Sequence, residues 1–129
     1  MSIKGVKVMV VDDTPVAHKA LSFILKQLGC EVVVADSGQK AISLFDASFD
    51  AIFIDFHMPN MDGDEATKLI RQKEEVLGKK KITFIVGVTA NVSKEIHLAC
   101  LDAGMNRVVI KPIHSEIIEE LFREQNLTN

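Results

Sequence analysis

The chain has 129 residues, 47% of them hydrophobic, and these values suit one soluble domain over residues 1–129 that buries about two-thirds of its unfolded surface. Its apolar runs fall short of the roughly 18 residues that cross a membrane, and its start is too short for a signal peptide, so we expect a cytoplasmic protein without membrane insertion. A formal net charge of -3 at pH 7 gives no general attraction to nucleic acid, so direct nucleic-acid binding is not expected.

Residues 6–11 form an apolar run interrupted by one lysine, which predicts a first strand that ends at Asp12 and Asp13. Thr14 can then cap a helix, because its hydroxyl can accept a hydrogen bond from a free N–H of the first turn, and a proline follows at a position that suits that turn. Apolar residues recur at helical spacing until Gly29, which ends the predicted helix.

Residues 30–35 are rich in valine and predict a second strand, after which residues 36–38 form a turn that opens a second helix. The cysteine that begins this strand, Cys30, and the second cysteine, Cys100, lie in apolar contexts at unrelated spacing. We therefore expect buried or half-buried thiols, with neither a disulfide framework nor a metal site. The residues expected to face inward from the second helix are Ala41, Ile42, Leu44 and Phe45.

The third apolar run, residues 51–54, contains no polar side chain, which is typical of a strand covered on both faces of a parallel sheet. Asp55 ends this run, at the point where open α/β sheets place their ligand sites. Residues 58–63 predict a loop, because Pro59 cannot continue the ladder of hydrogen bonds and Gly63 permits a tight bend before the next helix.

Residues 64–77 predict a third helix with Gly78 at its carboxyl cap, and the basic run at residues 79–81 fits a solvated loop. A fourth strand is expected over residues 82–88, ending at Thr89. In the third helix we expect Ala66, Leu69, Ile70 and Leu77 to face inward, and Lys68, Arg71, Gln72 and Lys73 to face outward.

Asn91 or Ser93 can cap a fourth helix, which Gly104 ends. Residues 108–110 predict a short fifth strand, and Lys111 follows it directly, before a proline. The apolar positions of the fourth helix are Ile96, Ala99, Cys100 and Ala103, and those of a final amphipathic helix are Ile117, Ile118, Leu121 and Phe122.

Five strands that alternate with helices require parallel pairing through right-handed crossovers, so we expect an α/β fold whose sheet carries helices on both faces. Parallel strands all end at the same edge of a sheet, which brings the residues at their carboxyl ends together. The side chains expected at that edge are Asp12, Asp13, Asp55, Thr89 and Lys111.

The carboxylates of Asp12, Asp13 and Asp55 would repel one another at this edge unless a cation joins them or a proton is taken up. Mg²⁺ is the expected cation, because it takes oxygen ligands and typically uses one or two carboxylates together with a phosphate oxygen. A carboxylate can also attack phosphorus and form an aspartyl-phosphate. The ammonium of Lys111 and the hydroxyl of Thr89 would then bind the other phosphoryl oxygens.

These residues, Asp12-Asp13, Asp55 with Met-Pro-Asn-Met-Asp-Gly behind it, Thr89-Ala90 and Lys111-Pro112, resemble the CheY-like receiver domain of two-component response regulators over essentially the whole chain. The resemblance implies a flavodoxin-like (βα)5 three-layer sandwich with strand order 2-1-3-4-5, and a cis peptide bond before the proline that follows Lys111. It further implies a signalling switch that takes a phosphoryl group from a phosphohistidine donor onto Asp55 with magnesium. Such a domain is not an enzyme beyond its own phosphotransfer and autodephosphorylation.

The resemblance also implies that Asp13, Asp55 and the backbone carbonyl of His57 ligate the metal, and Asp12 is expected to contribute through water. A histidine kinase or a histidine phosphotransfer protein would donate the phosphoryl group and contact the first helix. An unidentified downstream protein would bind the face made by the fourth helix, fifth strand and fifth helix. A start at Met1, directly before the first strand, favours a free-standing regulator over a receiver within a longer protein.

The sequence departs from the family pattern near the fifth strand. Val108 stands where receivers commonly carry Tyr or Phe, so we expect signalling through movement of the Thr89 loop and the fourth helix, without a change of aromatic rotamer. Residues 106–107, Asn-Arg, replace a frequent acidic pair and predict a distinct surface for partners. His57 and Asn91, two residues after the acceptor and the threonine, are expected to tune the rate of dephosphorylation.

Three other functions fit parts of the sequence. A receiver-shaped interaction module that is never phosphorylated would share the fold, although the intact acidic set and Lys111 argue against it. An aspartyl-phosphate phosphohydrolase needs a second aspartate two residues after its nucleophile, where this chain has His57. A flavin-binding module needs hydroxyl and N–H donors after the first strand, where Asp12 and Asp13 would repel a flavin phosphate.

Overall fold

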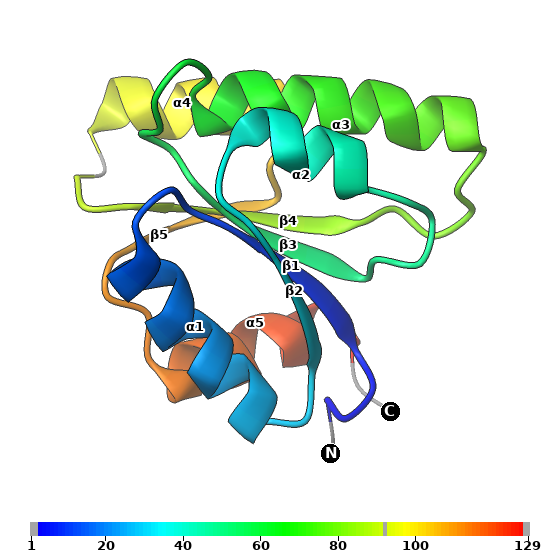
Figure 1. Cartoon of the computed structure of the whole chain (residues 1–129), viewed down its shortest axis with the longest axis vertical. Coiled ribbons are helices and arrows are strands. Elements are labelled where there is room, and N and C mark those ends of the chain that lie inside the picture. Colours follow the sequence, from blue (N-terminus) through cyan, green and yellow to red (C-terminus); the bar gives the residue numbers. More distant parts are fainter. Residues whose placement is uncertain (1–2, 92, 128–129) are drawn as a thin grey trace.

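The computed structural model describes residues 3–91 and 93–127, so Met1 and the chain end at Asn129 lie outside the described residues. Within these ranges, strands and helices alternate in the order that the sequence predicts (Figure 1). The strands are β1 (Lys7–Val11), β2 (Glu31–Ala35), β3 (Ala51–Asp55), β4 (Phe84–Thr89) and β5 (Arg107–Ile110). The helices are α1 (Pro15–Gln27), α2 (Gly38–Leu44), α3 (Gly63–Leu77), α4 (Lys94–Ala103) and α5 (Ser115–Glu124).

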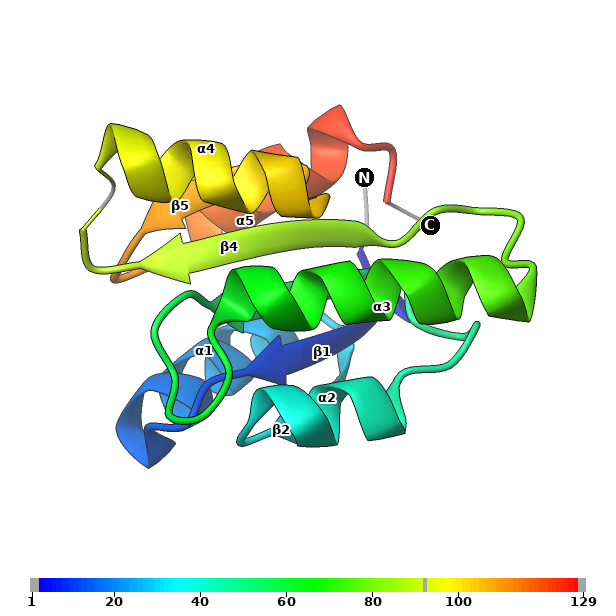
Figure 2. The ribbon, with the colours of Figure 1, turned by 90° about the horizontal axis from the view of Figure 1, so that it is seen from above.

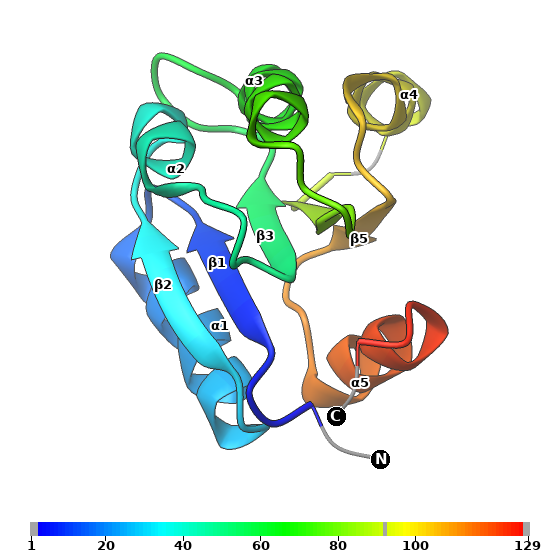
Figure 3. The same ribbon diagram turned by 90° about the vertical axis from the view of Figure 1, so that its right-hand side faces the viewer.

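The strands form one parallel sheet in the order β2-β1-β3-β4-β5, which confirms the expected flavodoxin-like α/β fold. Helices α2, α3 and α4 cover one face of the sheet and α1 and α5 cover the other, so the domain has three layers (Figures 1 and 2). Figure 3 shows β1 between β2 and β3, with helices on both sides of the sheet. The strand order reverses at β1 and β3, and the crevice outside their carboxyl ends is where such sheets bind ligands.

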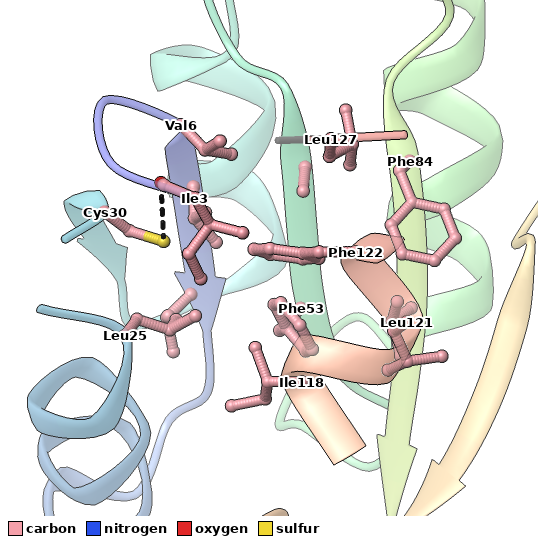
Figure 4. Packing of buried hydrophobic residues seen from close by; sticks show 14 of the residues in the cluster. Ile3, Val6, Leu25, Cys30, Phe53, Phe84, Ile118, Leu121, Phe122 and Leu127 are labelled. Atoms are coloured by element: carbon pink, nitrogen blue, oxygen red, sulfur yellow. Dashed lines mark hydrogen bonds between the residues drawn. The ribbon is translucent and has the colours of Figure 1, made fainter. Parts of the chain in front are cut away.

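Apolar side chains pack both faces of the sheet. Every residue of β3 is buried, as its apolar run predicts. On the face covered by α1 and α5, the ring of Phe122 lies between the rings of Phe53 and Phe84, with centroid distances of 5.9 and 6.4 Å (Figure 4). On the opposite face, Ile52 and Ile54 of β3 join a second cluster of buried residues. Packing on both faces therefore holds β3, and the carboxylate at its end, in a fixed position.

The fourth strand begins later than the sequence indicates. β4 starts at Phe84, and Ile82, expected within the strand, is 67% exposed. The backbone N–H of Thr83 instead donates a hydrogen bond of 2.7 Å to the carboxylate of Glu74. Leu77, expected to face inward near the end of α3, is 44% exposed. The β-branched pattern therefore predicted a strand that is too long at its start. The Glu74 side chain of α3 accepts the hydrogen bond from the Thr83 N–H that a neighbouring strand would otherwise accept.

Besides Leu77, three helical side chains point in the direction opposite to the predicted one. Leu44 is 39% exposed, because α2 ends at this residue and the buried Phe45 follows it. Arg71 was expected to face outward, but its guanidinium donates two hydrogen bonds to the carbonyl of Gly104. Lys73, also expected outward, donates a hydrogen bond of 2.8 Å from Nζ to a backbone carbonyl of α2. Cationic side chains of α3 thus connect this helix to both of its neighbours.

The sequence offers Asn91 and Ser93 as the residue that caps the start of α4, and the structure distinguishes between them. Ser93 is the capping residue, and its Oγ accepts a hydrogen bond of 3.2 Å from the backbone N–H of Ile96. Thr14 occupies the corresponding position of α1, but its side chain makes no capping hydrogen bond there. The expected cap of α4 is therefore confirmed at Ser93, whereas Thr14 caps α1 by position alone.

The cysteines behave as expected. Both side chains are buried and reduced, and burial raises the pKa of the Cys30 and Cys100 thiols to about 11, so both stay protonated at neutral pH. Among the described residues, no helix has the length and apolar composition that crossing a membrane requires.

Candidate functional site

Charged side chains from three strand ends meet at the carboxyl edge of the sheet. Asp12 directly follows β1, Asp55 is the last residue of β3, and Lys111 directly follows β5. The Nζ atom of Lys111 lies 3.0 Å from Oδ2 of Asp12 and 3.3 Å from Oδ1 of Asp55. One ammonium group therefore bridges two carboxylates that lie 43 positions apart in the sequence, at residues 12 and 55.

The main chain fixes these side chains in place. Asp12 and Asp55 are only 5% and 7% exposed. The second carboxylate oxygen of Asp12, Oδ1, accepts a hydrogen bond of 2.9 Å from the backbone N–H of Thr14. The backbone N–H of Lys111 donates a hydrogen bond of 2.8 Å to the carbonyl of Thr89, and the peptide bond between Lys111 and Pro112 is cis, as the family resemblance implied. The hydrogen bond to the end of β4 therefore orients the main chain of the lysine.

Burial and neighbouring charge perturb the ionisation of this group. Burial raises the pKa of the Asp55 carboxyl above its ordinary value, and the charge of Asp12 adds to the rise, while Lys111 opposes it. Burial alone would lower the pKa of Lys111, but its hydrogen bond to Asp12 and the charges of both carboxylates outweigh burial and raise that pKa. The Lys111 ammonium thus stays protonated, but its positive charge only partly offsets the effect of burial and of Asp12 on an ionised Asp55.

Asp13 completes an acidic cluster. Asp12, Asp13 and Asp55 each offer one carboxylate oxygen, and these oxygens all lie within 4.8 Å of one another. Three carboxylates beside one ammonium leave an excess of negative charge that a cation with a preference for oxygen ligands would neutralise. The donor set therefore fits a hard divalent cation such as Mg²⁺. His57, whose carbonyl belongs to the implied ligand set, is exposed two residues after Asp55, and its ring lies edge-on to Phe56 at a centroid distance of 4.7 Å.

Thr89 lies at the same edge, at the end of β4, and is 1% exposed. Its Oγ1 atom accepts a hydrogen bond from the backbone N–H of Asn91 and donates one to the Asn91 carbonyl, both at 3.2 Å. The bond that Thr89 donates is long for a hydroxyl group, so the hydroxyl can exchange it for a bond to a stronger acceptor. Thr89 therefore connects the site to the loop that leads into α4.

The departures from the family pattern occupy different environments. Val108 is half-buried and packs against the cluster on the α3 and α4 face, opposite Gly87 in the register of β4 and β5. Asn106 was expected to form part of a distinct partner surface, but its Oδ1 accepts a hydrogen bond of 2.8 Å from the backbone N–H of Ile85. Arg107 is exposed, so the distinct partner surface stays a prediction that now rests on Arg107, whereas the Asn106 side-chain oxygen is bonded to the main chain of β4.

Gly63 has a role that the sequence reading did not identify. Its backbone N–H donates a hydrogen bond of 2.7 Å to the carbonyl of Phe56, and a Cβ atom at this position would lie 2.3 Å from the carbonyl oxygen of Asp55. The start of α3 therefore packs directly against the main chain that carries the Asp55 side chain. The sequence shows the glycine, but its need for close approach depends on this packing.

A parallel sheet with an acidic cluster and a lysine at its carboxyl edge defines a class of flavodoxin-like domains with a charged site at the strand ends. Within this class, the chain belongs to the response regulator receiver domain family, whose family model matches residues 8–123. The family assignment confirms the resemblance that the motifs at the strand ends carry.

Relatives and solved structures agree with this assignment. The chain is 39% identical over 122 residues to hybrid signal transduction histidine kinase L of Dictyostelium discoideum, covering 92% of this chain and 7% of the kinase. It thus spans about a tenth or less of the first curated relatives it matches. The receiver domain of sensor histidine kinase PA1611 of Pseudomonas aeruginosa, solved with a magnesium ion in its active site cleft, is 30% identical with a TM-score of 0.78, covering 92% of this chain and 96% of that one. A variant of the receiver domain of histidine kinase CKI1 of Arabidopsis thaliana is 31% identical with a TM-score of 0.82, covering 96% and 91%.

Proposed function

We propose that this domain is a phosphoacceptor switch of a two-component or phosphorelay system, in which Asp55 receives the phosphoryl group. The observation that carries this proposal is the bridge from Lys111 to both Asp12 and Asp55 at the reversal point of the strand order. A buried carboxylate at this point has a cation beside it and an acidic cluster next to it, which are the parts that phosphoryl transfer to an aspartate needs.

The proposed transfer joins one carboxylate oxygen of Asp55 to phosphorus while the P–N bond of the phosphohistidine donor breaks, and the electron pair of that bond stays on the imidazole nitrogen. Asp12, Asp13, Asp55 and the carbonyl of His57 would hold a magnesium ion, which supplies positive charge beside the phosphoryl oxygens. The cluster oxygens within 4.8 Å of one another support this ligand set, and the related PA1611 receiver contains a magnesium ion.

Lys111 and Thr89 would bind the remaining phosphoryl oxygens. The Lys111 ammonium already lies 3.3 Å from the acceptor carboxylate, so it reaches the new charge with a small movement. Thr89 has to exchange the hydrogen bond that it donates to the Asn91 carbonyl for one to the phosphoryl group. That exchange moves the loop before α4, which gives the domain a route from the acceptor to its surface.

The proposed phosphodonor is a histidine kinase or a histidine phosphotransfer protein that contacts α1, whose Val16 and Phe23 are 79% and 64% exposed. The proposed downstream protein binds the face of α4, β5 and α5. This face exposes Leu98, Leu101, Ile110 and Ile117. The proposal includes a cytoplasmic location and no direct contact with nucleic acid.

The acceptor assignment is tested by incubating the protein with acetyl phosphate and Mg²⁺ and measuring the mass increase of one phosphoryl group. We expect wild type and Asp62→Asn, which changes an exposed aspartate of the neighbouring loop, to be modified, and Asp55→Asn to remain unmodified. Equal modification of Asp55→Asn would show that another residue is the acceptor. No modification of any of the three proteins would favour an interaction module that is never phosphorylated.

The lifetime of the phosphoryl group is proposed to depend on His57 and Asn91. Both positions are exposed beside the site, where their side chains can order or obstruct the attacking water. Substitution of either by alanine is expected to change the rate of dephosphorylation and leave the rate of phosphorylation largely intact. Unchanged decay in both variants would contradict this assignment.

A further inference from the structure

The guanidinium of Arg71 connects three segments at the edge of the sheet opposite Asp55. From α3, it donates hydrogen bonds of 3.0 and 2.7 Å to the carbonyl of Gly104, which caps the carboxyl end of α4. It also donates one of 2.9 Å to the carbonyl of Thr83, just before β4, and one of 3.0 Å to Oδ1 of Asn106, just before β5. The arginine therefore contacts the ends of α4, β4 and β5 at once.

The partners of Arg71 are themselves fixed. Glu74, 7% exposed, accepts a hydrogen bond of 3.0 Å from Arg71 and one of 2.7 Å from the backbone N–H of Thr83. Asn106 accepts a second hydrogen bond of 2.8 Å from Ile85, and its own N–H donates one of 2.8 Å to the Ile85 carbonyl. The network is thus closed and partly buried, where charge-assisted hydrogen bonds are strong.

The two ends of α4 are held very differently. At the carboxyl end, a cation donates two hydrogen bonds to the cap, which also complements the negative end of the helix dipole. Cys100 and Ala103, both buried, pack near this end. At the amino end, the one side-chain cap that the described residues provide is the Ser93 hydroxyl, with a bond of 3.2 Å, after the loop that Thr89 contacts. The end of α4 near the site is therefore the more weakly held end.

We infer that Arg71 is a positioning residue that anchors the carboxyl end of α4 to α3, β4 and β5, so that the response to phosphorylation is confined to the Thr89 loop and the amino-terminal half of α4. This inference rests on the proposed function, because it concerns the movement that modification of Asp55 starts. It also gives the Asn106 side chain a role, because its Oδ1 accepts hydrogen bonds from Arg71 and from the backbone of Ile85.

The experiment measures backbone amides by NMR in wild type, Arg71→Gln, Arg71→Lys and Lys68→Gln. Lys68→Gln is the matched control, because it removes the same charge from an exposed position of the same helix. Arg71→Gln removes the guanidinium and its two hydrogen bonds to the Gly104 carbonyl. Without ligand, this loss should accelerate hydrogen exchange of the amides at residues 100–106 by about tenfold or more. Arg71→Lys keeps the positive charge but cannot form the paired hydrogen bonds of the guanidinium, so its exchange should accelerate less. Lys68→Gln should show no acceleration.

The second readout adds Mg²⁺ with beryllofluoride, a phosphoryl mimic. In wild type and Lys68→Gln, shifts should be large at residues 89–97 and small at 101–106, whereas in Arg71→Gln they should extend to residue 106. Equal shifts along the whole of α4 in wild type, or unchanged exchange in both Arg71 variants, would overturn the inference. If beryllofluoride shifts no amide in any protein, the proposed function fails, and the ligand-free exchange still decides whether Arg71 anchors α4.

Discussion

Lys111 offsets much of the repulsion between Asp12 and Asp55, yet the pKa of Asp55 still lies above its ordinary value, first because of burial and then because of the Asp12 charge. The folded protein therefore binds a proton at Asp55 more readily than the unfolded chain does. Stability from this group is highest below the ordinary value of 3.8, falls as pH rises through the raised pKa, and stays reduced above it. An ionised Asp55 thus destabilises the fold at neutral pH in the absence of a metal ion.

Asp55→Asn is accordingly expected to raise the melting temperature by several degrees at pH 7 in the presence of a chelator, because the amide removes a buried charge. The gain should shrink as the pH is lowered toward 4, where the wild-type carboxyl becomes protonated. Thermal unfolding followed by circular dichroism between pH 4 and 8 measures this. A gain that is constant over the whole range would show that the charge of Asp55 is not its source.

Gly63 and Gly78 give a matched pair of substitutions. A Cβ at Gly63 would lie 2.3 Å from the Asp55 carbonyl oxygen, so Gly63→Ala must displace the start of α3 and should cost about 3 kcal/mol of unfolding free energy. Gly78 has open space around it but a φ of +65°, so Gly78→Ala should cost only about 1 kcal/mol. Urea denaturation measures both. Equal costs would mean that the β3–α3 loop adapts to the added methyl group.

The site residues could be predicted because each follows an apolar run directly. Asp12, Asp55, Thr89 and Lys111 are the residues at which four strands end, and parallel topology then places them together without further information. The role of Gly63 could not be predicted in this way, since its close contact is with main-chain atoms whose position depends on the packing of α3.

Among the secondary-structure elements, the helix starts differ in how their free N–H groups are bonded. Ser93→Ala should lower the unfolding free energy by about 1 kcal/mol, because it removes the bond that the hydroxyl accepts from Ile96. Thr14→Ala should have a much smaller effect, because the Thr14 side chain makes no such bond and its N–H is bound by Asp12. Chemical denaturation compares the two, and a larger loss for Thr14→Ala would contradict the difference between the caps.

The start of β4 and the direction of the Arg71 side chain are two features that the periodicity of the sequence predicts wrongly. Ile82 extends the β-branched pattern of β4, but Glu74 binds the backbone beside it and ends the strand earlier. Arg71 has the helical phase of a surface residue, and a charged side chain at such a position is normally solvated. Its acceptors include residues 83, 104 and 106, and no local pattern in α3 indicates that those carbonyl and amide groups lie beneath it.

For the whole molecule, binding of the proposed Mg²⁺ and folding should be linked, because the acidic cluster exists only when the strand ends are assembled. Mg²⁺ at about 100 times its dissociation constant should stabilise the native state by about 2.7 kcal/mol. Asp13→Asn, which removes one oxygen of the cluster, should lose most of this gain, whereas Asp36→Asn, at an exposed turn, should keep it. Melting curves with magnesium or with chelator measure the effect. A gain that survives in Asp13→Asn would place the ion elsewhere.

The central position of β1 bears on the order in which the domain is made. Its pairing with β2 becomes possible once residue 35 has left the ribosome, but its other edge stays open until β3, ending at Asp55, has followed. At ordinary elongation rates of about 5–20 residues per second, that gap lasts roughly 1 to 4 s. Lys111 comes later still, so the acidic strand ends of a nascent chain lack their counter-ion until residue 111 has followed. The charged site is therefore complete only after the strand that Lys111 follows, β5, has been translated.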